Sequence, residues 1–252
     1  MLKDTIKKRA NLTKRQEKIE EYFINDAILY TNKHLETYKK DPYSLKGRYI
    51  CSDLMKRTFT FYNENKLEHN ELDFLIHNSA ASLTDELFQE IVIDKKIKDC
   101  FFVAGIPGAG KSFFIQTLIF EEKISPTTMI YEGSIITDTI IDKIKLALKN
   151  KKKIHLIIIN PTLNLAYENI LNRQRKTGRG ASLETMANIY SNLYNAVMRL
   201  YQIFGNELNI KIYSKTKNDE MKLYTQVHDI NQLKTESYEE VLKKLKEIRK
   251  KA

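Results

Sequence analysis

Eight consecutive residues, 105–112, could hold a chain of phosphate groups. They read Gly-Ile-Pro-Gly-Ala-Gly-Lys-Ser. The glycines let backbone N–H groups turn inward around an anion without a clash of Cβ atoms. The lysine then brings a cation to the terminal phosphates, and the serine hydroxyl can bind Mg²⁺. This order of residues therefore predicts a phosphate-binding loop for a nucleotide that carries a magnesium ion.

The segments on either side of this loop suit the same role. Residues 100–104 form an unbroken apolar run, which is typical of a strand buried on both faces of a parallel sheet. An apolar helix is expected from 113 to about 121, and its positive end would face the phosphates. We therefore expect a nucleotide and its Mg²⁺ as cofactors, with Ser112 as the metal ligand. The predicted nucleotide contacts come from Gly105, Ile106, Pro107, Gly108, Ala109, Gly110, Lys111, Ser112 and Phe113.

Four more residues could act on a bound phosphate. Glu132 ends an expected strand, where open α/β sheets place ligands, so its carboxylate could hold the metal or an acceptor hydroxyl. Arg173 and Arg179 lie in a basic segment with glycines, and cations around the transferring group favour phosphoryl transfer. Asp53 ends a short expected strand and could accept a proton. From the residues alone, Glu132 could also be an exposed loop acid, and Arg173 and Arg179 could lie at a solvated basic helix end. Asp53 by itself is better explained as an acid at a strand end.

A carboxylate is missing from one place where many ATP-hydrolysing motors carry one. The clearest buried strand, 154–159, is followed by Asn160 and not by aspartate. The run 91–94 ends in an aspartate but precedes the loop, and it fits a helix face better. These observations argue against a motor ATPase and leave a small kinase as the favoured class.

The elements that must position these groups alternate between strands and helices. This alternation predicts an α/β fold of the P-loop NTPase type, with a mainly parallel sheet flanked by helices. Helices are expected at 13–40, 54–65, 70–97, 113–121, 137–149, 162–175, 182–204 and after a capping box at Ser237 and Glu240. Strands are expected at 47–53, 100–104, 128–131, 153–159 and 208–213, with a hairpin partner at 221–227.

The first helix sets the expected domain organisation. Ile19, Phe23, Ala27 and Tyr30 recur at helical spacing, and Asp41-Pro42 should end the helix. We therefore predict an N-terminal helical extension at 1–45 and a kinase domain at 46–252. The extension could shield the predicted nucleotide site, but packing on the core is the favoured role.

Composition limits the class of protein. The chain has 252 residues, of which 42% are hydrophobic, so it can bury a sizeable core. No run of about 18 or more uncharged apolar residues is present, and no apolar segment follows the basic start, so neither a membrane span nor a secretory signal is expected. Cys51 and Cys100 lie in apolar runs and are predicted to be buried thiols of a cytoplasmic protein.

The net charge of +10 favours anionic partners. Many lysines, however, stand at the ends of expected helices, where cations suit the helix dipole. No basic stripe interleaved with aromatic residues, of the kind that binds single strands, is present. A nucleotide is therefore a better candidate partner than a nucleic acid.

Taken together, these residues resemble the zeta toxin family of P-loop kinases over about 101–213. Glu132-Gly133-Ser134 resembles the E-G-T element of the family, and Arg173 followed by Gly178-Arg179 resembles its arginine segment. Zeta toxins transfer the γ-phosphate of ATP to UDP-N-acetylglucosamine. The resemblance implies that Lys111 and Ser112 handle ATP and Mg²⁺, that the two arginines stabilise the transferring group, and that Glu132 contacts the acceptor. The implied acceptor contacts are completed by Ser134, His77 and Asn78.

The chain departs from the family in one respect. The family usually carries its base, an aspartate at a strand end, between the P-loop helix and the E-G-T element. Here only 19 residues separate Ser112 from Glu132, with no acid at a strand end among them. Residues 49–56 and the helix with His77-Asn78 resemble that missing section. Our hypothesis is a rearranged sheet in which Asp53 supplies the base from upstream.

Several alternatives remain open at this level. The acceptor could be another nucleotide, NAD or an RNA end, and the protein could be a non-catalytic nucleotide-binding module. Antitoxins of the family are helical, so the resemblance also implies a helical antitoxin as a partner.

Overall fold

The computed structural model describes residues 6–65, 69–135, 138–215, 221–224, 230, 233 and 236–251. Its centre is a six-stranded sheet with the order β1-β3-β2-β4-β5-β6. The first five strands in this order run parallel to their neighbours, and β6 is antiparallel to β5. The strands are β1 (Tyr49–Cys51), β2 (Asp99–Gly105), β3 (Thr128–Glu132), β4 (Lys153–Pro161), β5 (Leu208–Lys215) and β6 (Met221–Tyr224). The predicted α/β fold of the P-loop type is confirmed.

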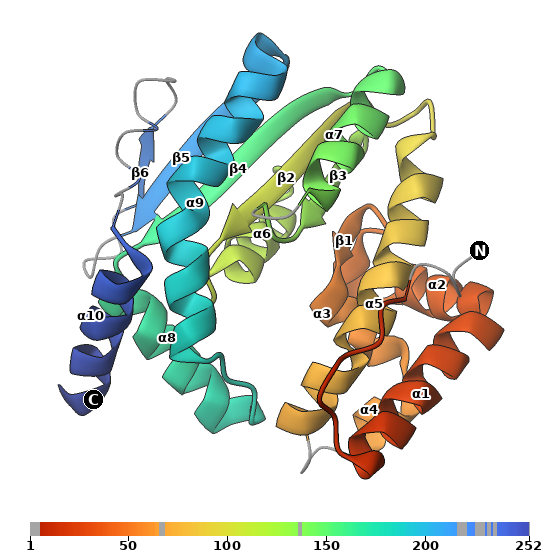
Figure 1. The fold of residues 1–252 in the computed structure, drawn as a ribbon. Coiled ribbons are helices and arrows are strands. Elements are labelled where there is room, and N and C mark those ends of the chain that lie inside the picture. Colours follow the sequence, from red (N-terminus) through yellow and green to blue (C-terminus); the bar gives the residue numbers. More distant parts are fainter. Residues whose placement is uncertain are drawn as a thin grey trace.

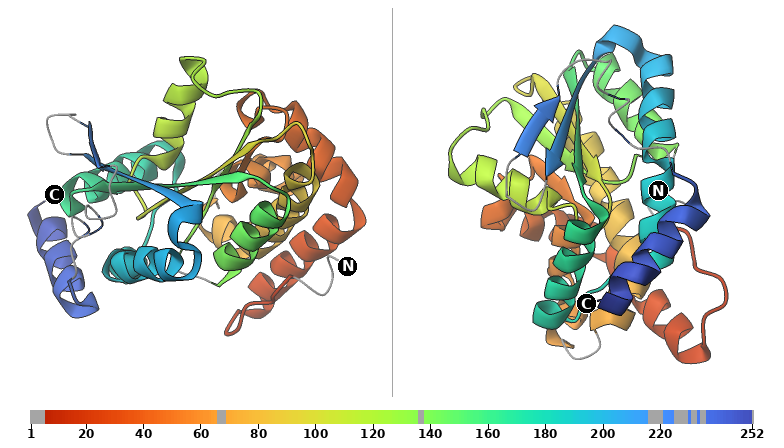
Figure 2. Two further views of the ribbon diagram at one scale, coloured as in Figure 1. Left: turned by 90° about the horizontal axis from the view of Figure 1, so that it is seen from above. Right: turned by 90° about the vertical axis from the view of Figure 1, so that its left-hand side faces the viewer.

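Helices flank this sheet. One face packs against α7 and α9, and α6 lies on the other side (Figures 1 and 2). None of the helices in the described ranges is long and apolar enough to span a bilayer. The helices are α1 (Lys14–Leu29), α2 (Thr31–Lys40), α3 (Ser52–Met55), α4 (Thr60–Glu64), α5 (His69–Val92), α6 (Lys111–Phe120), α7 (Thr139–Lys149), α8 (Leu163–Thr177), α9 (Leu183–Phe204) and α10 (Tyr238–Lys251).

The central strand β2 places the phosphate-binding loop. It pairs with β3 on one side and β4 on the other, and Phe102 in its middle is fully buried. Because β2 ends at Gly105 and α6 begins at Lys111, the loop lies at the carboxyl edge of the sheet, between two neighbouring strand ends. Cys51 and Cys100 are buried free thiols, as predicted.

The helices expected at 13–40 and 54–65 are each divided. The first begins with a capping box between Thr13 and Gln16 and ends at Leu29, before α2. The second consists of α3, a 3₁₀ turn at Lys56–Thr58, and α4. The helix expected at 70–97 ends at Val92. The capping box at Ser237 and Glu240 is present, whereas the hairpin connection at 216–220 and residues 225–227 lie outside the described part of the chain.

The N-terminal helices share the core of the sheet. Phe23 and Ala27 on α1 and Tyr38 on α2 are fully buried. The Tyr38 hydroxyl donates to the Tyr49 carbonyl over 2.7 Å and accepts the Cys51 N–H over 2.9 Å. Helix α2 therefore holds β1, the strand that leads to Asp53. This favours core packing as the role of the segment, while the domain boundary at 45/46 stays a prediction.

Candidate active site

The phosphate-binding loop fits closely against its neighbours. At Gly105, a Cβ atom would lie 2.2 Å from the Ile159 carbonyl oxygen on β4. At Gly108, where φ is +78°, it would lie 2.1 Å from the Ala166 carbonyl oxygen on α8. The Asn169 amide also donates to the Gly108 carbonyl over 2.9 Å. Glycine is therefore required here both by backbone conformation and by lack of space.

This fit gives a prediction for Gly108→Ala. We expect a loss of at least about 3 kcal/mol of unfolding free energy, because the left-handed backbone alone costs about 1–3 kcal/mol for a side-chain-bearing residue and the clash adds to it. Gly178→Ala is the matched control, since Gly178 has φ +73° with open space around it. It should lose only the backbone cost of about 1–3 kcal/mol, without the contribution of a clash. Urea denaturation of both variants measures the difference, and equal losses would contradict the close fit.

Lys111 lies folded over the loop. Its ammonium group donates to the Gly105 carbonyl over 3.1 Å and to the Ile106 carbonyl over 3.2 Å. Helix α6 begins at this residue, so its unpaired N–H groups and positive end face the same space. The loop thus combines a cation, helix N–H groups and glycine backbone in the arrangement that binds phosphate.

Glu132, at the end of β3, faces the first turn of α6. The Ser112 hydroxyl lies 3.2 Å from one oxygen of its carboxylate and 3.1 Å from the other. The Tyr49 hydroxyl on β1 donates to the Oε2 atom over 2.5 Å. Two strands and the loop helix therefore meet at one carboxylate.

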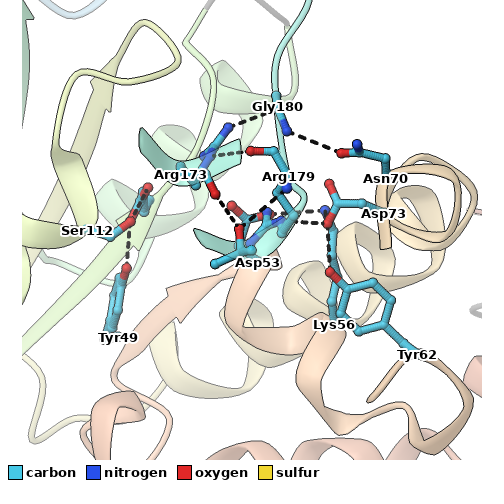
Figure 3. A network of polar contacts seen from close by, with 12 residues as sticks. Tyr49, Asp53, Lys56, Tyr62, Asn70, Asp73, Ser112, Arg173, Arg179 and Gly180 are labelled. Atoms are coloured by element: carbon cyan, nitrogen blue, oxygen red, sulfur yellow. Dashed lines mark hydrogen bonds and ion pairs between the residues drawn. The ribbon is translucent and has the colours of Figure 1, made fainter. Parts of the chain in front are cut away.

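A ring of alternating charges lies beside the loop (Figure 3). Arg179 contacts Asp53 over 2.7 Å and Asp73 over 3.0 Å. Lys56 contacts the same two carboxylates, each over 3.0 Å, and only 2% of its side chain is exposed. The Tyr62 hydroxyl also donates to Asp73 over 2.9 Å. The ring joins α3, α5 and the loop after α8, and its two acids balance its two bases.

The ring sets the ionisation of Asp53. Burial by itself would raise its pKa, but Lys56 and Arg179 outweigh burial, so the pKa lies well below its usual range. Burial would lower the pKa of Arg179, but Asp53 and Asp73 raise it above its usual value. Asp53 is therefore a carboxylate and Arg179 a cation at neutral pH.

Arg173 supports the loop that carries Arg179. Its guanidinium donates to the Arg179 carbonyl over 3.2 Å and to the Gly180 carbonyl over 3.0 Å. The Gly180 N–H in turn donates to the Asn70 side chain on α5 over 3.3 Å. Burial, and then the nearby charge of Arg179, lower the pKa of Arg173. The loop is thus fastened to both α8 and α5.

Two cavities meet at this site. The larger, about 430 Å³, is lined by the phosphate-binding loop together with Asp53, Glu132, Asn169 and Arg173. The smaller, about 200 Å³, is lined in part by His77, Ser134 and Ile189. Both are also lined by Asp53, Pro107, Lys111 and Glu132. The base candidate and the loop lysine therefore lie where two spaces join, one against residues 107–113 and one beyond them.

The residues predicted to contact an acceptor are placed differently from one another. His77 and Ser134 line the smaller cavity. Burial, then the charge of Lys56, lower the pKa of His77 below its usual value, so it is neutral at pH 7. The Asn78 amide instead donates to the Lys7 carbonyl over 2.6 Å, and Asn78 is not among the residues that line either cavity.

Sequence reasoning missed several members of the site, among them Lys56, Tyr49 and Asp73. Lys56 stands three residues after Asp53, a spacing that brings side chains together on a helix and could have drawn attention. Nothing in the local sequence marked Tyr49 or Asp73. Across the described residues, no group of three or more histidine, cysteine or acidic side chains is arranged to hold a metal ion. A metal here would depend on a few protein oxygens and on the phosphates of a nucleotide.

No protein-family model matches the chain, and no curated protein matches it. Similar solved structures include the PezAT toxin-antitoxin system of Streptococcus pneumoniae, at 11% identity and TM-score 0.46 over 96% of this chain and 97% of that one. Another is AvrRxo1-ORF1:AvrRxo1-ORF2 with ATP, at 12% identity and TM-score 0.44 over 90% and 74%. The same complex with sulphate ions has 12% identity and TM-score 0.41 over 91% and 75%.

Proposed function

We propose that the protein is an ATP-dependent phosphotransferase that moves the γ-phosphate of ATP to a hydroxyl of a nucleotide sugar such as UDP-N-acetylglucosamine. The observation that carries this proposal is the junction of the two cavities at Asp53 and Lys111. A kinase needs a phosphate site and an acceptor site that share one boundary, with a base and a cation at that boundary. The resemblance to zeta toxins supplies the nucleotide sugar and a helical antitoxin partner, and the free thiols of Cys51 and Cys100 suit the reducing cytoplasm.

The site also suits the magnesium ion that accompanies ATP. The Ser112 hydroxyl, exposed at the start of α6, is a hard oxygen ligand of the type that Mg²⁺ prefers. Bound with the nucleotide, the ion would neutralise charge on the phosphates. Lys111 would exchange its two carbonyl contacts for phosphate oxygens, because a charged acceptor binds an ammonium group more strongly than a neutral one does.

In the proposed reaction, Asp53 accepts the proton of the acceptor hydroxyl. That oxygen then bonds to the γ-phosphorus, the bond from this phosphorus to the bridging oxygen breaks, and ADP leaves. The resting ion pair with Arg179 makes Asp53 a weak base. A triphosphate would compete for the Arg179 guanidinium, and its movement toward phosphate would leave Asp53 with Lys56 alone and a higher pKa. Nucleotide binding would thereby prepare the base.

The test is to incubate the protein with γ-labelled ATP, Mg²⁺ and separate acceptors: UDP-N-acetylglucosamine, other nucleotides, NAD and RNA ends. A labelled nucleotide sugar that requires active protein supports the proposal. Label in NAD, in another nucleotide or in RNA would replace the acceptor and keep the kinase. ATP binding without transfer to any acceptor in a metabolite extract would make the protein a nucleotide-binding module instead.

A further inference from the structure

The strands beside β2 carry different side chains at their carboxyl ends. On one side, β4 continues from Ile159 into Asn160 and Pro161, so it provides no acid next to the loop. On the other side, β3 ends in Glu132, which pairs in register with Val103, two residues before Gly105. The carboxylate that P-loop enzymes often carry near the metal is thus absent from β4, and an acid stands at the same edge on β3.

The distances at Glu132 suit a shared cation. Both of its carboxylate oxygens lie 3.1–3.2 Å from the Ser112 hydroxyl. Mg²⁺ binds oxygen ligands in an octahedron, and two adjacent ligands at its usual distance are about 3.0 Å apart. Ser112 and Glu132 therefore already have nearly the spacing of two neighbouring ligands of one magnesium ion.

The charges around Glu132 also favour the binding of a cation. Within the described residues, Glu132 forms no ion pair with a lysine, arginine or histidine. Lys111 donates to loop carbonyls, and Arg179 and Lys56 are engaged by the other two carboxylates of the site. A carboxylate without a cationic partner, beside a phosphate-binding loop, gains by binding a metal ion.

Tyr49 fixes the orientation of this carboxylate. Only 3% of Tyr49 is exposed, and it stands on β1, which pairs with β3. Its hydroxyl donates to Oε2 of Glu132 over 2.5 Å, while both carboxylate oxygens still face the Ser112 hydroxyl, at 3.2 Å for Oε1 and 3.1 Å for Oε2. Hydrogen bonds of this kind orient metal-binding carboxylates and typically contribute a factor of about 10–100 in metal affinity.

We propose that Glu132 is a carboxylate ligand of the magnesium ion that enters with ATP, together with Ser112, and that Tyr49 is its positioning residue. This inference rests on the proposed function and deepens it, because it assigns Glu132 to the metal and not to the acceptor. The donor set matches a hard cation: one carboxylate, one hydroxyl, and phosphate oxygens and waters for the remaining positions.

Calorimetric titration with a non-hydrolysable ATP analogue tests the assignment without measuring turnover. Each protein is titrated once with Mg²⁺ and once with EDTA. Glu132→Gln should weaken binding by about 10-fold or more with Mg²⁺ and by less than about 2-fold in EDTA. Tyr49→Phe should show the same selective loss, smaller in size. Glu121→Gln is the matched control, because Glu121 pairs with Lys123 at the surface and should change neither titration.

The outcomes separate the inference from the proposed function. A wild-type protein that binds no ATP analogue would overturn both. Equal losses with Mg²⁺ and with EDTA, or unchanged Mg²⁺-dependent binding in Glu132→Gln, would overturn the metal role of Glu132 alone. Thermal unfolding confirms that each variant is folded. If Glu132→Gln is not, Glu132→Asp and Tyr49→Phe decide the question, because a shorter or unanchored carboxylate should still lose affinity only with Mg²⁺.

Discussion

Replacing Asp53 with asparagine is expected to lower kcat for phosphate transfer by about 10²–10⁴-fold, the usual contribution of a general base. Asparagine keeps the shape of the side chain but cannot accept the proton of an acceptor hydroxyl. It also leaves Arg179 paired with Asp73, so the loop after α8 should keep its place. Initial rates at saturating ATP and acceptor measure the effect.

Two further measurements make this prediction specific to the base. Affinity for ATP should change only a few-fold, because the phosphate-binding loop is untouched. Asp142→Asn, on the exposed side of α7, is the control and should stay within about 0.5 kcal/mol of the wild-type stability, with full activity. Full phosphate transfer by Asp53→Asn would remove Asp53 from the mechanism and, with it, the hypothesis of a base supplied from upstream of the loop.

Replacing Lys111 with alanine should have an effect of similar size for a different reason. The ammonium group is the loop's cation, and loss of a charge that stabilises the transferring phosphoryl group reduces rates by about 10³-fold. Its present hydrogen bonds go to the Gly105 and Ile106 carbonyls, and Lys111 is only half-buried, so the fold should be little changed. Rates and thermal unfolding midpoints should be measured on the same preparation.

The control for this variant is Lys123→Ala. Lys123 is another lysine close to α6, but its side chain is 64% exposed and pairs with Glu121 at the surface. Surface pairs of this kind contribute little, so both activity and stability should be retained. Transfer at the wild-type rate by Lys111→Ala would show that the loop is not the phosphate site of a kinase.

The helix boundaries show where local sequence is insufficient. The periodic pattern at 13–40 predicted one helix, but α1 ends at Leu29. The Thr31 hydroxyl donates to the Ala27 and Ile28 carbonyls, and such side-chain bonds compete with the regular helix pattern. The predicted stop at Asp41-Pro42 was right, because proline imposes its restriction on the backbone whatever surrounds it.

The sequence by itself predicted the phosphate-binding loop and determined the alternation of strands and helices. Both are local: the loop needs glycine, lysine and serine in consecutive positions, and a buried strand needs a continuous apolar run. The strand order could be predicted only in part from the sequence. A strand upstream of the loop was proposed to bring Asp53 to the site, but its pairing with β3 depends on contacts between segments far apart in the chain.

Only the tertiary structure decided which charged side chains pair with one another. Lys56, Asp73 and Arg179 come from three elements, and no periodicity relates an acid on α5 to an arginine beyond α8. The same holds for Tyr49 and Ser112, which β1 and α6 bring to the carboxylate of Glu132 at the end of β3. Strong interactions between buried charges require short distances, and such distances are set by the packing of helices on the sheet. Residue types could therefore predict a phosphate site, whereas the partners of each charged group followed from the fold.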